Sequence, residues 1–200
     1  MKDRFIEIYK QNISRPGSDK LLAWLETTDF FTAPASTRFH LSRPGGLVEH
    51  SIHVFDRLMK LYIAERTDPD QPVSYCPMSE ELETITICGL LHDICKAEFY
   101  DVEMRNRKNE LGQWEKYPFY IVKDKLPYGH GEKSVYIISS FMKLSREEAM
   151  AIRWHMGFSD NEFRAGGYSV GNAFEKFPLA VLMHMADLQA TYLDEADGDA

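Results

Sequence analysis

The sequence is poor in several features that mark whole classes of proteins. Only three of its 200 residues are cysteines, and none stands in a Cys-x-x-Cys pair, which argues against a disulfide framework and a thiolate zinc site. No run of about 18 apolar residues is present. The opening Met-Lys-Asp-Arg-Phe also lacks the apolar stretch of a signal peptide. We therefore expect reduced thiols, no membrane span and a cytoplasmic location.

Positive charge is scarce as well. The chain has 23 Lys and Arg residues against 31 Asp and Glu residues, a formal net charge of -8. Proteins that bind long nucleic acids by bulk electrostatics are basic. A phosphate-bearing ligand must therefore be held by a local positive site, which favours a small phosphorylated substrate or a nucleic-acid end. The oligomeric state stays open.

Apolar residues recur at helical spacing along most of the chain. Hydrophobic residues make up 44% and charged residues 27% of the sequence, as in ordinary globular domains. No repeat or second domain is visible, so we expect one domain over residues 1–200, with N-terminal helices within residues 1–40. Helices are predicted at about residues 2–13, 18–25, 47–65, 79–96, 132–143, 145–155 and from 178 onwards, with Ser18, Ser79 and Ser145 as N-caps. Loops are expected at residues 30–46, 67–77 and 157–167, and a frayed acidic tail at residues 194–200.

Residues 98–126 differ from the rest because aromatic and β-branched residues dominate them. Residues 109–112, Asn-Glu-Leu-Gly, form a turn candidate in the middle. This pattern predicts a β-hairpin, so the fold class is all-α with a β-hairpin insertion. We expect Trp114, Tyr117 and Tyr120 to pack on the helices, and stacking on a nucleobase is the alternative.

Histidines on apolar helices are the informative feature. His50 lies between Leu47 and Val54, His92 follows Gly-Leu-Leu, and Asp187 lies in an otherwise apolar stretch. A polar group on a buried face is costly unless it has a partner. A single such histidine is more often a satisfied core residue, but several on different helices need a common explanation. A metal held by imidazoles and carboxylates supplies one.

Three segments carry a resemblance to a known family. His50 follows Gly-Gly-Leu-Val-Glu, His92 and Asp93 are followed by Ile-Cys-Lys, and Asp187 comes late in the chain. With these residues the chain resembles the HD-domain superfamily of metal-dependent phosphohydrolases, from about His40 to Tyr192. It looks most similar to the HD domains of bacterial 3′-5′ exoribonucleases and of related uncharacterised HD hydrolases. Those domains have a similar Gly-His segment, here Gly129-His130, but two adjacent histidines where this chain has Trp154-His155.

The resemblance implies a helical bundle with a site for one or two divalent ions, among which Fe, Mn, Mg, Ni and Zn are not distinguished. One ion would take His50, His92, Asp93 and Asp187. A second would take His130 and His155, with Asp93 bridging. Asp93 and Lys96 would be the catalytic residues, and the substrate would be contacted by Lys96, Arg43, Lys133 and His40, with Arg38 as a further candidate.

The implied activity is that of a phosphohydrolase or phosphodiesterase. It would act on a nucleotide or a nucleic-acid end through a metal-activated hydroxide. Two alternatives remain open. One is a di-iron oxygenase on the same scaffold, and the other is a metal-stabilised binding module without turnover.

Overall fold

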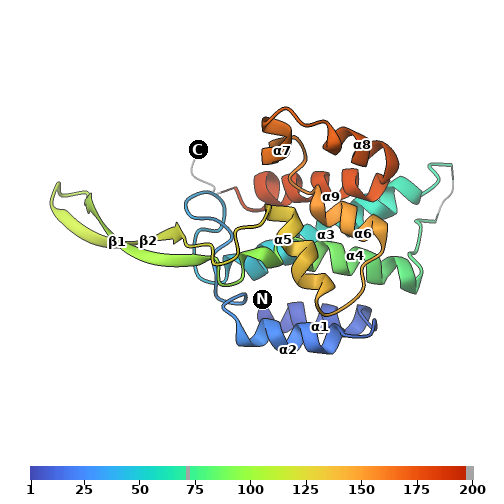
Figure 1. Cartoon of the computed structure of the whole chain (residues 1–200), viewed down its shortest axis with the longest axis horizontal. Helices are drawn as coiled ribbons and strands as arrows, with labels where there is room; N and C mark the ends of the chain where they lie inside the picture. Colours follow the sequence, from blue (N-terminus) through green and yellow to red (C-terminus); the bar gives the residue numbers. More distant parts are fainter. Residues whose placement is uncertain (71–72, 197–200) are drawn as a thin grey trace.

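The computed structural model describes residues 1–70 and 73–196, and its fold is mostly helical with one β-hairpin, as predicted. The central helices α3 (Gly46–Arg66) and α4 (Ser79–Leu91) pack side by side, and α9 (Pro178–Gln189) packs along α3 (Figure 1). The remaining helices surround this centre: α1 (Lys2–Asn12), α2 (Ser18–Thr27), α5 (His130–Ser139), α6 (Arg146–Arg153), α7 (Asn161–Arg164) and α8 (Ser169–Lys176). The core consists of fully buried apolar side chains such as Leu47, Ile52, Leu58, Ile85 and Leu90, whose removal from water drives folding.

The helix starts follow local capping chemistry. Ser145 begins α6 with the predicted capping box, because its Oγ accepts a hydrogen bond from Glu148 N (3.1 Å) and Glu148 Oε2 accepts one from Ser145 N (2.7 Å). Pro178 occupies the first turn of α9, also as predicted. The predicted N-caps Ser18 and Ser79 are wrong by one residue. Each is the first helical residue, and the residue before it, Gly17 or Met78, is the N-cap.

Helix α4 ends five residues earlier than predicted. The apolar periodicity suggested a helix as far as Lys96, but α4 ends at Leu91, and residues Ile94–Lys96 form a 3-10 turn. Asp93 lies between the two with non-helical angles (φ -104°, ψ 18°). Its carboxylate is held by Lys96, three residues further on, and by His130 at the start of α5. One consequence of the earlier helix end is that Cys88 and Cys95 do not share a helix.

The hairpin consists of β1 (Tyr100–Lys108) and β2 (Trp114–Val122), which pair in antiparallel register from Tyr100 opposite Val122 to Lys108 opposite Trp114. The predicted turn is present, and Asn109 Oδ1 accepts hydrogen bonds from the backbone of Leu111 and Gln113. The hairpin projects from the helical body (Figure 1). For this reason the expectation that Trp114 packs on the helices is wrong, since its side chain is 70% exposed.

Other boundaries differ between prediction and structure. Helix α5 covers residues His130–Ser139 rather than 132–143, the expected loop 157–167 contains α7, and α8 was not predicted. The tail is not frayed at its start, because Asp194 pairs with Arg57 and Glu195 is 5% exposed. Residues 71–72 of the expected linker and residues 197–200 of the expected tail lie outside the described residues. Within the described residues, no helix has the length and apolar character that a membrane span requires.

Candidate metal centre

The predicted metal ligands converge from five places in the fold. His50 lies in the first turns of α3, and His92 and Asp93 follow the end of α4. His130 begins α5, His155 follows α6, and Asp187 lies in α9. The chain positions are far apart, but the helix ends that carry them meet on one side of the core. The six residues form two groups that share Asp93.

The first group is centred on His50. Its Nε2 lies 3.2 Å from Asp187 Oδ1, 3.3 Å from His92 Nε2 and 3.7 Å from Asp93 Oδ2. The side chains of His50, His92 and Asp93 are 1%, 0% and 3% exposed, respectively. Two imidazoles and two carboxylates therefore present ligand atoms to one small volume.

The second group faces the other oxygen of Asp93. His130 Nε2 lies 2.8 Å from Asp93 Oδ1, and His155 Nε2 lies 3.5 Å from the same atom. His155 Nε2 is buried and has no hydrogen-bond partner among the described residues. Since the two oxygens of Asp93 point to different histidine groups, this carboxylate can bridge two ions.

The ring nitrogens that face away from the centre are held by the protein. His50 Nδ1 lies 3.0 Å from Glu195 Oε1, His92 Nδ1 lies 2.9 Å from Gly89 O, and His155 Nδ1 lies 2.7 Å from Ile152 O. Such acceptors keep the hydrogen on Nδ1, so that Nε2 offers its lone pair when the ring is neutral, which is the arrangement of metal-binding histidines. Together with the unpartnered Nε2 of His155, this shows that the residues present fit a metal ion.

Comparison with known protein families gives an independent result. A model of the HD domain family matches residues 47–199, which is more than half of the chain. The chain belongs to the HD-domain family. Members of this family are generally metal-dependent phosphohydrolases. The comparisons with curated proteins and with solved structures found no match, so nothing in them supports a closer relation to the exoribonucleases.

We call the candidate metal centre the HD centre. Its charged groups shift one another's pKa values. Burial alone would raise the pKa of Asp93, but Lys96, His92 and His130 outweigh it and hold this pKa well below its usual value. Burial also lowers the pKa of His92, to about 3. At His50 burial acts in the same direction, but hydrogen bonds to Asp187 and Glu195 outweigh it and raise the pKa to about 9. The carboxylates therefore stay ionised, and His92 is a neutral imidazole at neutral pH.

Lys96 is bound to the HD centre. Its Nζ lies 2.7 Å from Asp93 Oδ2 and donates a hydrogen bond to Ala35 O (2.8 Å). Burial alone would lower its pKa, but Asp93 and Tyr100 raise it overall. The lysine is therefore a fixed cation beside the carboxylate that both groups share.

A cavity of about 620 Å³ opens onto this centre. Its wall includes six of the predicted residues: His40, His50, Asp93, Lys96, His130 and Asp187. The other two predicted substrate contacts lie elsewhere. Arg43 pairs with Glu49, and Lys133 pairs with Asp124. Among the described residues, neither Arg43 nor Lys133 lines the metal cavity.

Sequence reasoning missed several residues of the cavity wall, of which Glu195 is the most important. Its Oε1 accepts hydrogen bonds from the Nδ1 atoms of both His50 (3.0 Å) and His53 (2.9 Å). In the sequence Glu195 stands in an acidic terminal run that resembles a solvated tail. Arg164, Phe39 and Tyr192 also line the cavity, and no pattern in the sequence marks them.

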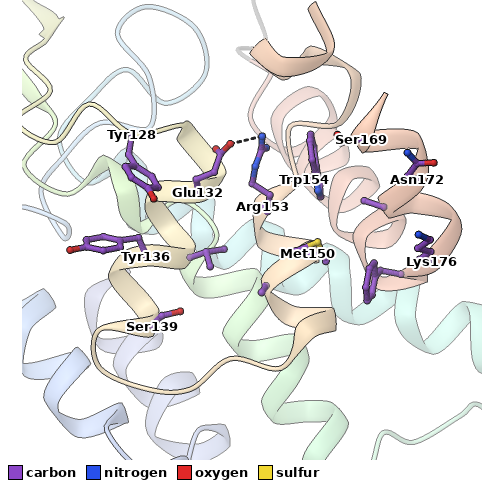
Figure 2. Close-up of a pocket in the computed structure, with 14 residues that line it drawn as sticks. Tyr128, Glu132, Tyr136, Ser139, Met150, Arg153, Trp154, Ser169, Asn172 and Lys176 are labelled. Atoms are coloured by element: carbon purple, nitrogen blue, oxygen red, sulfur yellow. Dashed lines mark ion pairs between the residues drawn. The ribbon is translucent and has the colours of Figure 1, made fainter. Parts of the chain in front are cut away.

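A second, larger cavity lies away from the HD centre. It measures about 750 Å³ and lies between α5, α6 and α8, with Trp154, Tyr136 and Met150 on its walls (Figure 2). An ion pair between Glu132 and Arg153 crosses one end. None of the described residues that line it is a predicted metal ligand. Size alone therefore does not identify the reactive site.

Proposed function

We propose that this HD domain is a metal-dependent phosphohydrolase or phosphodiesterase that acts on a nucleotide or a nucleic-acid end. One observation carries the proposal: Asp93 lies between two imidazole groups at the wall of an open cavity, with the ammonium of Lys96 beside it. Imidazole and carboxylate donors suit borderline divalent ions. A phosphate is the substrate group that such ions and a neighbouring lysine would bind together.

The resemblance divides the candidate ligands into two sets. His50, His92, Asp93 and Asp187 would hold one ion, and His130 and His155 would hold a second with Asp93 between them. Divalent ions bound there supply Lewis-acid polarisation of a phosphoryl oxygen and acidify water. The chain itself contributes the fixed geometry, since the second ring nitrogen of His50, of His92 and of His155 is already engaged.

Two cavity residues would act on the substrate directly. Lys96 stays protonated and lies beside Asp93, so it would neutralise charge on a phosphate oxygen or on the leaving oxygen. Burial, together with His50 and Lys96, lowers the pKa of His40. His40 would therefore be neutral, with its buried Nε2 unpartnered among the described residues. A neutral imidazole in this position can hydrogen-bond to a substrate hydroxyl or accept its proton.

Metal analysis and a substrate panel test the proposal. The native protein is expected to contain divalent metal and to hydrolyse phosphodiesters or nucleotides. His92→Ala and Asp93→Asn should lose both, whereas the control Asp101→Asn, on the exposed hairpin, should keep both. Full metal content and full activity in the two variants at the centre would overturn the proposal. Oxygen consumption with reduced iron and no phosphate release would favour the di-iron oxygenase instead.

A further inference from the structure

A third cavity adjoins the metal cavity. It measures about 590 Å³ and lies between residues 37–44, before α3, and the base of the hairpin. The side chain of Phe39 lines both cavities, and the next residue, His40, faces the metal centre. A substrate with its phosphate at the metals would therefore extend past Phe39 into this third cavity. Both volumes lie within the range of about 300–1,000 Å³ that is usual for small-molecule sites.

The segment that separates the two cavities is fixed by hydrogen bonds. Ser36 Oγ accepts one from Phe39 N (2.9 Å) and donates one to His40 O (2.8 Å). Just before it, Ala35 O accepts hydrogen bonds from Lys96 Nζ (2.8 Å) and from Tyr100 OH (3.1 Å). The segment is thus tied both to the catalytic lysine candidate and to the first residue of the hairpin. Such a preorganised wall costs little entropy when a ligand binds.

Aromatic and positively charged side chains line the third cavity. Phe39 is 67% exposed, and the guanidinium of Arg38 lies 5.1 Å from its ring centre. Val102 and residues 117–120 of the hairpin complete the lining. No carboxylate lines this cavity in the part of the chain that the structure describes. An exposed aromatic ring next to cationic groups is the arrangement on which nucleobases stack.

The two arginines of this cavity differ in how they are engaged. Arg43 donates hydrogen bonds to both oxygens of Glu49 (2.8 and 2.6 Å), which neutralises it. Arg38 forms no ion pair with any described residue, and its guanidinium makes a cation–π contact with the Phe39 ring. Arg38 is therefore the cation available to a phosphate that flanks a stacked base.

We propose that the cavity between Arg38, Phe39 and the hairpin is a nucleobase subsite. It would hold the base next to the phosphate at the metal centre, and Arg38 would contact the following phosphate. The inference rests on the proposed function and makes it more specific. The substrate would be a short oligonucleotide end rather than a phosphate ester that lacks a base.

A mutant cycle between protein and substrate tests the subsite. Hydrolysis of a short single-stranded oligonucleotide is compared with that of the same strand carrying one abasic residue at the cleaved end. In the native protein, loss of the base should raise KM by roughly 5- to 150-fold, as for one stacked base. In Phe39→Ala, which we expect to retain its metal, the strands with and without the base should have similar KM values. For Arg38→Gln, the slope of log KM against log salt should shrink by about 0.7, as for one lost contact to a single strand.

A matched control is Trp114→Ala, at the far end of the hairpin. Its ring is 70% exposed, against 67% for Phe39, and we expect it to behave like the native protein. Equal KM values for the two strands in the native protein would overturn the subsite while leaving the hydrolase proposal intact. Failure to hydrolyse any phosphate ester despite bound metal would overturn the hydrolase proposal itself. Anisotropy of the labelled strands reads base-dependent binding without turnover and would show the same dependence on Phe39.

Discussion

Replacing Glu195 should weaken metal binding although this residue is not itself a proposed ligand. Its side chain is 0% exposed and its carboxylate accepts hydrogen bonds from the Nδ1 atoms of His50 and His53. Burial alone would raise its pKa, but the hydrogen bonds to His50 and His53 outweigh it and lower the pKa to about 2. A full negative charge therefore holds the ring of His50 in place and increases the basicity of its Nε2.

The magnitude follows from what each variant removes. Loss of an acceptor that orients a metal-binding histidine costs about 10- to 100-fold in metal affinity, or about 1.4–2.8 kcal/mol. Glu195→Gln keeps the size of the side chain and one oxygen and removes only the charge. We therefore expect metal affinity to fall by about 10-fold. Glu195→Ala also leaves Nδ1 of His50, whose side chain is 1% exposed, without its acceptor. For this variant we expect metal affinity to fall by about 100-fold.

Metal affinity would be measured by competition with a chelator of known affinity. The control is Asp194→Asn, because Asp194 is the neighbour of Glu195 but pairs with Arg57 at the surface. We expect native affinity in this control. Affinities of both Glu195 variants within twofold of the native value would refute the role of Glu195. An equal loss in Asp194→Asn would mean that anchoring of the segment, rather than the carboxylate, is responsible.

Two further predictions concern the scaffold. Arg15→Ala should lower the free energy of unfolding by about 3–5 kcal/mol, because it leaves the fully buried Glu148 unpaired. Burial alone would raise the pKa of Glu148, but Arg15 holds it below its usual value. Chemical denaturation should therefore show the full difference in unfolding free energy between the native protein and Arg15→Ala above the ordinary glutamate pKa. This difference should disappear as the pH falls through the lowered pKa. Gly89→Ala should destabilise the fold and weaken metal binding, since the added Cβ would lie 2.6 Å from Phe55 Cα where α3 and α4 meet. In contrast, thermal unfolding should show that Gly171→Ala in α8 is neutral or stabilising by up to about 1 kcal/mol, because no described residue outside its own stretch of helix lies within 4 Å of the added Cβ.

Some candidate ligands could be picked out because they break the apolar pattern of their helices, whereas the full candidate set came from the resemblance to the HD domains. His50 and His92 stand on buried faces, where an unpartnered imidazole is costly. The hairpin was predictable for a related reason, since residues 109–112 interrupt a stretch rich in strand-forming side chains. In both cases a local signal was sufficient to identify the feature.

The missed features depend on contacts between distant segments. Helix α4 ends at Leu91, and the carboxylate of Asp93 just beyond it pairs with His130, 37 residues further along the chain, as well as with nearby Lys96. Glu195 was missed for a similar reason. The π-helical turn Ala190–Asp194 follows α9 and brings Glu195 over the cavity. Such wide turns often occur at functional sites, but a single sequence does not announce them.

The electrostatics of the centre lead to one last prediction. Asp93, Asp187 and Glu195 are ionised beside the single ammonium of Lys96, which leaves a net charge of -2 in a largely buried site. Protons can supply the missing positive charge. The carboxylates raise the pKa of His50 to about 9, and Cys95 and Asp93 raise that of His130 to about 10, in both cases against the effect of burial.

A divalent ion would supply the same charge and would compete with these protons, because it needs the lone pairs of the two imidazoles. Metal binding at pH 7 should therefore release close to two protons, and apparent affinity should rise with pH until both imidazoles are neutral. Calorimetry of metal binding in buffers of different ionisation enthalpy counts the released protons. A count near zero at pH 7 would mean that His50 and His130 are already neutral there, and it would contradict this charge balance.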